Sequence, residues 1–265
     1  MVRLNWNEDG TFPKGTPDPF LPKNRKEIAE LIVQEQADMG AAWDADADRA
    51  FFFDEKGRLF PGYYINALLI EHFLKKDPNQ TVIIEPRLTW ATKDIATKLG
   101  GNVALAKVGH TYIKNAMRDN DGVFGGESSG HFYYKDFYYC DNGAITFLLI
   151  TGIFTEYMSQ GKKVSELLDT FMHNFPANLD EHNFITDKAK EIVEQTEIKY
   201  DDALIEKIDG LSVEYPDWRF NMRTSNTEPV LRVNIEAKTP ELLEAKRSEL
   251  LSFVETFGAT LRNDS

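Results

Sequence analysis

The sequence predicts an α/β protein in which domains built on parallel sheets precede an α+β carboxyl-terminal domain. Between about residues 60 and 127, short apolar runs alternate with segments of helical periodicity, which is typical of parallel strands joined by helices. The last hundred residues instead combine several strand-like runs with two helical segments. A chain of 265 residues is long enough for two or three small domains.

The first sixty residues predict a surface loop, a helix and two strands. Residues 8–25 are rich in Pro, Gly and charge, which favours an extended loop. Residues 25–40 have apolar side chains at helical spacing and end at Gly40, which we expect to cap the helix. Residues 50–60 predict two strands joined by a turn at "DEKG", residues 54–57.

The middle of the chain alternates strictly between the two kinds of element. Helices are expected over 62–76, 89–100 and 111–119, and strands over 81–85, 102–107 and 122–127. Ligand loops of a parallel sheet lie at the carboxyl ends of its strands. The stretches "GHTYIK", residues 109–114, and "GESSGH", residues 126–131, occupy such positions.

The carboxyl-terminal part starts after a helix predicted over 162–175, which Pro176 ends. Its clearest strand is "VLRVNIEA", residues 230–237, where apolar and polar residues alternate. One face carries Leu231, Val233 and Ile235, and the other carries Arg232, Asn234 and Glu236.

Composition limits the possible partners. The net charge of −13 argues against nucleic acid, because phosphate backbones require basic surfaces. The single cysteine, Cys140, allows no intrachain disulfide, so a reducing cytoplasm is the simplest setting. Met1 leads into a polar segment rather than a signal peptide, and the apolar run at 144–154 is too short to span a bilayer, so we expect no membrane partner.

The stretch "WDADADRAFFFDE" predicts a metal site. Asp44, Asp46 and Asp48 point the same way if the segment is extended, and their mutual repulsion would raise the pKa of one of them. A divalent cation removes this conflict, and carboxylate oxygens suit Mg²⁺ or Ca²⁺. Arg49 follows directly and could help to hold a phosphate.

Two other interpretations of this stretch remain open. An EF-hand loop would use the same aspartates and Glu55, but it requires a glycine where Arg49 stands, and it requires flanking helices. A solvated acidic turn would need no ligand at all. A loop that binds Mg²⁺ and leaves positions open for a phosphate oxygen fits better than either.

Two further loops carry polar groups suited to a sugar phosphate. In "GGESSGH", the alternating Glu127, Ser129 and His131 could project together toward sugar hydroxyls, although a plain surface turn is equally compatible. In "RTSNTEP", residues 223–229, a guanidinium, hydroxyls, an amide and turn N–H groups favour a phosphate site, with a hydrophilic β-turn as the alternative. A metal loop, a polyol loop and an anion loop in one chain indicate sugar-phosphate chemistry.

With these loops, the chain resembles the α-D-phosphohexomutases, and within them the bacterial phosphomannomutases. The family patterns Asp-Gly-Asp-x-Asp-Arg, Gly-Glu-x-Ser-Gly-His and Arg-x-Ser-Asn-Thr-x-Pro correspond here to "DADADR", "GESSGH" and "RTSNTEP", in the same order. Segments such as "FDEKGRLFPGYY", "EPRLTWAT" and "YYKDFYYCDNG" are similar as well. The resemblance implies a partial domain 2 at 1–58, a complete domain 3 at 59–172 and domain 4 at 173–265.

The resemblance also implies a role for each matching residue. Asp44, Asp46 and Asp48 would bind Mg²⁺, with Arg49 on the phosphate beside it. Glu127, Ser129 and His131 would form the sugar loop, with Arg87 and His110 nearby. The substrate's distal phosphate would contact four residues, namely Arg223, Ser225, Asn226 and Thr227. Ligands would be a hexose phosphate and a hexose 1,6-bisphosphate.

Two departures from the family pattern matter. Ala45 replaces a glycine of the metal loop and would cost about 1 kcal/mol if that position needs positive φ. The family's phosphoserine segment, Thr/Ala-Ser-His-Asn-Pro, does not occur in these 265 residues. We therefore expect the carboxyl-terminal part of a mutase that lacks the catalytic serine and is inactive alone, whether it is a fragment, a gene remnant or the partner of a separate amino-terminal half.

The implied reaction interconverts mannose 6-phosphate and mannose 1-phosphate through a bisphosphate. Three alternatives remain at this point: phosphoglucomutase specificity, a non-catalytic sugar-phosphate-binding module, and a Mg²⁺-dependent phosphatase with an Asp nucleophile. The phosphatase is the weakest of the three, since a lysine and a second acidic loop are not placed convincingly for it.

Overall fold

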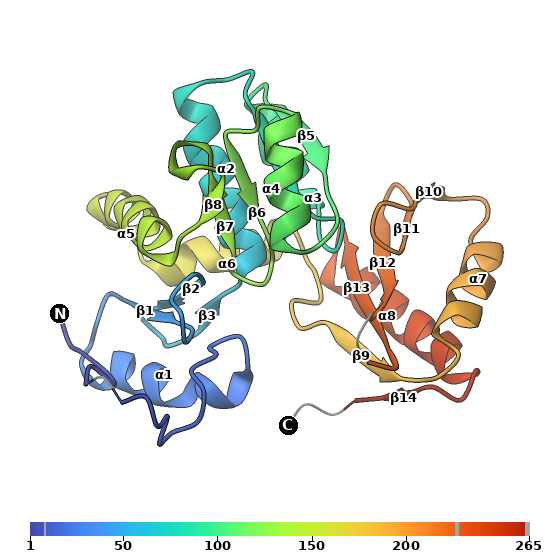
Figure 1. Ribbon diagram of the computed structural model, residues 1–265, viewed down its shortest axis with the longest axis horizontal. Coiled ribbons are helices and arrows are strands. Elements are labelled where there is room, and N and C mark those ends of the chain that lie inside the picture. The colour runs from blue at the N-terminus through green and yellow to red at the C-terminus, as the bar shows by residue number, and fades with distance from the viewer. Residues whose placement is uncertain (8, 226–227, 263–265) are drawn as a thin grey trace.

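A computed structural model describes residues 1–7, 9–225 and 228–262, which form three units along the chain (Figure 1). We call them the first, middle and last units. Each has its own sheet, and the middle unit lies between the other two (Figure 1).

The first unit follows the predicted order of loop, helix and strands, and its sheet has one strand, β1, beyond the two predicted. An antiparallel sheet of order β1-β2-β3 packs beside α1. Its elements are η1 Pro22–Asn24, α1 Lys26–Gln34, β1 Met39–Trp43, β2 Ala50–Asp54 and β3 Leu59–Phe60.

The prediction that Gly40 caps the helix is wrong. The helix ends at Gln34, and Gly40 lies inside β1. The glycine serves packing instead, since an added Cβ would lie 2.3 Å from the Cδ1 atom of Ile32. Gln36, with φ 52°, is the residue that turns the chain after the helix.

The middle unit is an α/β/α sandwich on a five-stranded sheet of order β5-β4-β6-β7-β8. The three strands β5, β4 and β6 are parallel as predicted, while β7 and β8 add antiparallel strands at one edge, so the sheet is mixed. Its strands are β4 Thr81–Ile84, β5 Asn102–Leu105, β6 Phe124–Gly126, β7 Phe132–Tyr134 and β8 Cys140–Asp141. Its helices are α2 Gly62–Lys76, α3 Trp90–Lys98, α4 His110–Asp119, η2 Lys135–Phe137, α5 Gly143–Ser159 and α6 Val164–Asn174.

Alternation along β4 divides the apolar side chains of the middle unit between two cores. Val82 and Ile84 belong to the large core that includes α2, α3 and α5, whereas Ile83 faces Ile113 and Met117 of α4. Full burial of such side chains stabilises the unit by about 1.5–3 kcal/mol each. The loops at the carboxyl ends of the parallel strands are thereby fixed at one edge of the sheet.

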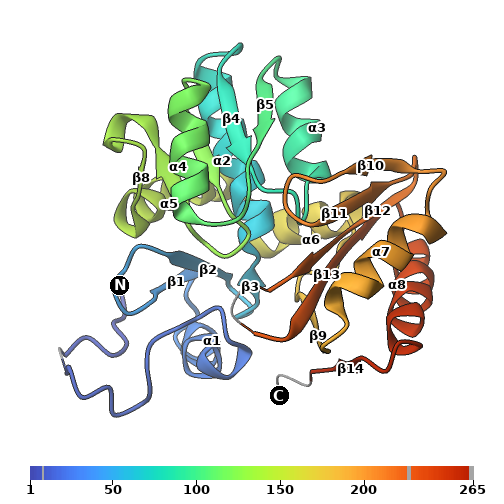
Figure 2. The same ribbon diagram turned by 45° about the vertical axis from the view of Figure 1, so that its right-hand side comes forward.

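The last unit is a six-stranded antiparallel sheet of order β10-β11-β12-β13-β9-β14, with α7 and α8 packed on one face (Figure 2). Its strands are β9 His182–Ile185, β10 Leu204–Glu206, β11 Leu211–Glu214, β12 Trp218–Thr224, β13 Val230–Ala237 and β14 Thr260–Leu261. Its helices are α7 Ala189–Lys199 and α8 Pro240–Glu255. The predicted alternation of β13 is confirmed, with Leu231, Val233 and Ile235 fully buried in the core.

The polar face of β13 is buried too, which the alternation alone did not predict. Asn234 and Glu236 are 4% and 1% exposed, because this face of the sheet meets the middle unit. Within residues 1–7, 9–225 and 228–262, no helix has both the length and the apolar character that a membrane span requires.

Candidate active site

The three aspartates of the predicted metal loop converge. Asp44, Asp46 and Asp48 each offer a carboxylate oxygen, and these oxygens lie within 4.8 Å of one another. The segment is a turn rather than the extended chain considered above, since the Ala47 N–H donates to the Asp44 carbonyl over 3.3 Å. A turn brings the carboxylates together as alternation along a strand would have done.

The backbone strain of this loop falls on a different alanine from the one expected. Ala45 is not among the described residues with positive φ, whereas Ala47 has φ 59°. The predicted cost at Ala45 therefore does not arise. A left-handed alanine costs roughly 1–2 kcal/mol, and here that strain belongs to Ala47.

The carboxylate of Asp48 has the environment of a ligand. Burial raises the pKa of Asp48 above its ordinary value, the charges of Asp44 and Asp46 raise it further, and His131 partly opposes them. This confirms that one carboxylate of the triplet is perturbed upward. The Oδ1 atom of Asp48 is buried and has no hydrogen-bond partner among the described residues.

Arg49 lies beside the metal loop and is bound by two carboxylates. Its Nε donates to Asp44 Oδ2 over 2.7 Å, and a terminal nitrogen lies 3.5 Å from Asp18 Oδ1. Its backbone forms an isolated antiparallel bridge with His131 of the sugar loop. Residues from the first and middle units are thus joined at this point.

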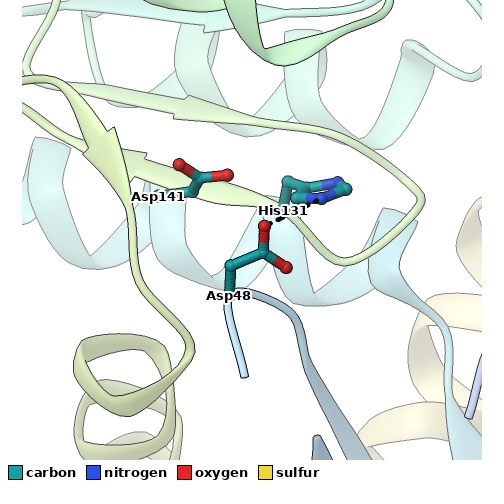
Figure 3. Close-up of side chains that lie close together, drawn as sticks. All are labelled: Asp48, His131 and Asp141. Carbon is teal, nitrogen blue, oxygen red and sulfur yellow. Dashed lines mark ion pairs between the residues drawn. The ribbon is translucent and has the colours of Figure 1, made fainter. Parts of the chain in front are cut away.

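His131 points from the sugar loop toward the metal loop. Its Nε2 lies 3.6 Å from Asp48 Oδ2, and its Nδ1 lies 3.2 Å from Ser129 Oγ. Figure 3 shows Asp48, His131 and Asp141 together, and their ligating atoms also lie within 4.8 Å of one another. Asp141 is paired with Lys114 over 2.9 Å, so its charge is already matched.

Glu127 is buried, being 2% exposed, and both of its oxygens accept hydrogen bonds. Tyr133 donates its hydroxyl to Oε1 over 2.5 Å, and the Gly109 N–H donates to Oε2 over 3.3 Å. The second bond ties the sugar loop to the start of α4. His110, the first residue of α4, is exposed at that end.

Glu85 is a site residue that the sequence reasoning missed. It directly follows β4, is 1% exposed, and pairs with Arg87 Nε over 2.9 Å. Its Oε1 also accepts from Ser128 Oγ over 2.6 Å. Glu85 therefore joins the loop at residues 85–89, which we call the Arg87 loop, to the sugar loop. Its position at the end of "TVIIE" is the sequence signal that could have identified it.

Glu181 is the second missed residue, and it lies between two arginines. Arg223 and Arg232 face each other across β12 and β13. Glu181 pairs with Arg223 over 3.2 Å and with Arg232 over 3.3 Å. Two cations share one carboxylate, so the cluster keeps a net positive charge suited to an anion.

The rest of the predicted phosphate loop is described in part. The Ser225 N–H donates to the Val230 carbonyl over 2.9 Å, and Ser225 Oγ accepts from the Glu228 N–H over 3.3 Å. Asn226 and Thr227 lie outside the described residues. Ser225 is therefore held by local bonds to Glu228 and Val230.

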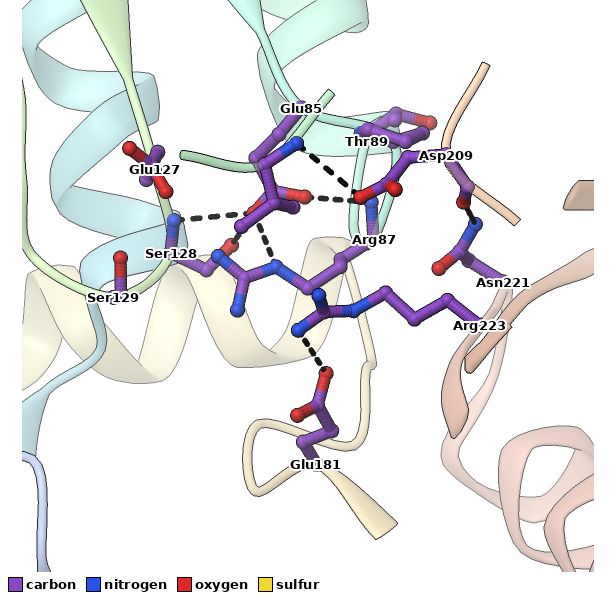
Figure 4. Close-up of polar contacts among 12 residues, drawn as sticks. Glu85, Arg87, Thr89, Glu127, Ser128, Ser129, Glu181, Asp209, Asn221 and Arg223 are labelled. Atoms are coloured by element: carbon purple, nitrogen blue, oxygen red, sulfur yellow. Dashed lines mark hydrogen bonds and ion pairs between the residues drawn. The ribbon is translucent and has the colours of Figure 1, made fainter. Parts of the chain in front are cut away.

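The Arg87, sugar and phosphate loops meet in one place. Figure 4 shows the guanidinium groups of Arg87 and Arg223 directed into the same region, between Ser128 and Glu181. The middle and last units also touch beside it, where the Val108 N–H donates to Asp209 over 3.2 Å. The metal loop contacts the sugar loop through His131.

The chain is similar in sequence to known proteins over most of its length. A phosphomannomutase of Escherichia coli is 42% identical over 258 residues, which are 96% of this chain and 56% of that protein. A phosphomannomutase of Vibrio cholerae is 43% identical over 258 residues, covering 96% and 55% of the two chains. The chain spans about half the length of these curated relatives.

Among solved structures, a phosphoglucomutase/phosphomannomutase family protein from Burkholderia thailandensis superposes with a TM-score of 0.82 and 27% identity, over 98% of this chain and 56% of that one. Family profiles for phosphoglucomutase/phosphomannomutase match along the chain: alpha/beta/alpha domain II at residues 1–57, alpha/beta/alpha domain III at 61–175 and the C-terminal domain at 181–252. The chain belongs to the phosphoglucomutase/phosphomannomutase family, the α-D-phosphohexomutases.

Proposed function

We propose that this chain supplies the metal, sugar and phosphate loops of a phosphomannomutase, which interconverts mannose 6-phosphate and mannose 1-phosphate through mannose 1,6-bisphosphate. The observation that carries the proposal is the meeting of Arg87 and Arg223 from two units beside the sugar loop (Figure 4). The names of the relatives at 40–43% identity support mannose as the sugar.

The aspartate loop is suited to Mg²⁺. Three carboxylates within reach of one point form an oxygen-only donor set, and the unpartnered Oδ1 of Asp48 leaves one ligand atom without a competing bond among the described residues. Bound there, Mg²⁺ would offset negative charge on a phosphoryl group in transfer. Arg49, next to the loop, would contact the same phosphate once it exchanges its bond to Asp44.

The sugar and phosphate loops would orient the substrate. Glu127, fixed by Tyr133, and Ser129 would bind sugar hydroxyls. Arg223 and Ser225 would hold the phosphate that is not reacting, and we assign the same contact to Asn226 and Thr227. His131, His110 and Arg87 complete the surroundings of the sugar. Binding the remote phosphate would hold the reacting hydroxyl in place, which is a large source of rate in such reactions.

We also propose the division into a partial domain 2 at 1–58, domain 3 at 59–172 and domain 4 at 173–265. In the complete enzyme, a phosphoserine outside these residues would donate and recover the phosphoryl group. A separately encoded amino-terminal half is one way to supply it. Glucose phosphates would meet the same Glu127 and Ser129, so phosphoglucomutase activity is the second candidate.

Calorimetric titration of the 265-residue chain with mannose 1-phosphate and glucose 1-phosphate tests this proposal. We expect binding of mannose 1-phosphate that Arg223→Gln weakens by about 10-fold or more, since a charge-assisted hydrogen bond is lost. Arg247→Gln is the matched control, because Arg247 pairs only with Glu244 on α8 among the described residues. Binding that is equal in both variants would remove the assigned site.

A further inference from the structure

A buried ion pair joins the last unit to the middle unit. Arg219 of β12 and Glu236 of β13 face each other across the strands, and a terminal nitrogen of Arg219 lies 2.6 Å from Glu236 Oε2. Their side chains are 2% and 1% exposed. Burying two charges costs desolvation free energy, which the pair must offset with further hydrogen bonds.

Glu236 caps a helix that belongs to the other unit. Its Oε2 accepts from the Thr89 N–H over 2.7 Å and its Oε1 from the Trp90 N–H over 3.0 Å, at the start of α3. The side chain of Thr89, the N-cap residue, makes no capping bond within the described chain. A carboxylate at this place satisfies free amides and interacts favourably with the helix dipole.

Arg219 binds the segment that leads into the same helix. It donates to the Pro86 carbonyl over 2.8 Å and to the Arg87 carbonyl over 3.0 Å. The pair therefore contacts the backbone of the middle unit from Pro86 to Trp90. That segment carries Arg87, whose side chain enters the candidate active site with Glu85 (Figure 4).

The same two strands continue to the phosphate loop. Arg219, Asn221 and Arg223 follow one another on one face of β12, opposite Glu236, Asn234 and Arg232 of β13. Arg223 lies four positions after Arg219 along the strand, a distance of about 13 Å. Strand β12 thus has one end bound to the Arg87 backbone and the other end in the phosphate site.

We propose that Arg219 and Glu236 are positioning residues that set the separation between Arg87 and Arg223, so that both guanidinium groups meet one sugar phosphate. The identity of the ligand rests on the proposed function, whereas the contact of Arg219 and Glu236 with the middle unit does not. The pair acts through the Pro86–Trp90 backbone and touches no ligand itself.

The test uses a double variant, Arg219→Met with Glu236→Leu, in the full 265-residue chain. Removing Arg219 alone would leave the buried Glu236 charge without its cation and could unfold the protein, whereas removing both charges is often tolerated. Thr239→Ala is the control, because Thr239 is exposed and its hydroxyl accepts the Leu242 N–H at the start of α8, within the last unit.

Amide hydrogen exchange measures directly the contact between Glu236 and the amides at the start of α3. In the double variant we expect the Thr89 and Trp90 amides to lose protection by about 10-fold or more, because their acceptor is gone, while amides of the buried strand β4 stay protected. Thr239→Ala should leave both amides as they are. Unchanged protection of Thr89 and Trp90 in the double variant would overturn the proposal.

Spin labels measure the separation of the units without any ligand. Leu148 on α5 and Ile198 on α7 are 69% and 65% exposed, so Leu148→Cys and Ile198→Cys in a Cys140→Ser background provide the two attachment points. We expect the distance distribution to broaden or shift in the double variant and to stay unchanged with Thr239→Ala. An identical distribution would overturn the positioning role.

Two probes then separate this inference from the proposed function. Glucose 1,6-bisphosphate should bind the double variant about 10-fold more weakly than the wild type, since Arg87 and Arg223 no longer hold one geometry. The affinity for inorganic phosphate, followed by NMR at the Ser225 amide, should differ by less than about 2-fold between the wild type and the double variant, because neither substitution lies in the phosphate loop. Unchanged bisphosphate affinity would contradict the proposal. A wild type that binds no bisphosphate would contradict the proposed function, and the label distances would still decide the positioning role.

Discussion

The Nε2 atom of His131 lies 3.6 Å from the Oδ2 atom of Asp48, so the sugar loop of one unit touches the metal loop of another. The backbone bridge between Arg49 and His131 reinforces this contact. The two loops are therefore positioned together, and a change in either should be measurable at the metal site.

We expect Asp48→Asn to weaken Mg²⁺ binding by at least about 10-fold, because it replaces a charged ligand by a neutral amide. Calorimetric titration of the chain with MgCl₂ measures the effect. Asp121→Asn is the control, since Asp121 is an exposed carboxylate paired with Lys135 and outside the loop. Equal magnesium affinity of the wild type and Asp48→Asn would show that the triplet is only a solvated acidic turn.

The local parts of the site could be predicted from the sequence. The aspartate triplet spans five residues, so any compact turn brings its carboxylates together, and the prediction survives even though the loop is not extended. The apolar face of β13 follows from strict alternation in the same way. Patterns of this length depend on backbone geometry, which the sequence determines locally.

The missing parts depend on contacts between distant segments. Glu181 lies 42 positions from Arg223, and Glu236 lies 147 positions from Thr89, so no local pattern predicts either contact. Gly40 shows the same limit, because glycine favours a helix end by itself, but packing against Ile32 placed it in a strand. Tertiary contact overrides local preference at such positions.

We expect the 265-residue chain to show no mutase turnover by itself, since none of its residues forms the family's phosphoserine segment. A coupled assay with mannose 1-phosphate and a hexose 1,6-bisphosphate activator measures turnover. Binding of the same bisphosphate by calorimetry is the control that the protein is folded. Turnover that disappears with Arg223→Gln would contradict the expectation, because it would belong to this site and not to a contaminant.

Tyr133→Phe should weaken binding of mannose 1-phosphate by about 10-fold while leaving inorganic phosphate binding unchanged. The hydroxyl of Tyr133 is a donor to Glu127, and its loss frees the carboxylate that we assign to the sugar. Tyr134→Phe is the matched control, because the neighbouring tyrosine loses a buried bond to Thr146 on the opposite face of β7. Calorimetry measures the affinity for mannose 1-phosphate. An equal loss of affinity in both variants would mean that the effect comes from general stability and not from Glu127.

Glu85 gives the fold a dependence on pH. Burial by itself would raise the pKa of Glu85, but the Arg87 charge and the Ser128 bond outweigh it, so the pKa lies below its ordinary value of 4.5. A carboxylate with a lowered folded pKa stabilises the protein above the unfolded pKa, and that contribution is lost as the pH falls through the folded pKa.

We therefore expect Glu85→Gln to lower the free energy of unfolding at pH 7 by about 3 kcal/mol, because Arg87 loses its buried partner. The difference should shrink as the pH falls below 4.5. Urea unfolding of both proteins between pH 7 and pH 3 measures it, with Glu156→Gln, an exposed carboxylate on α5, as the baseline. A difference that stays constant over this range would mean that the Glu85 charge does not stabilise the fold and that only the shape of its side chain matters.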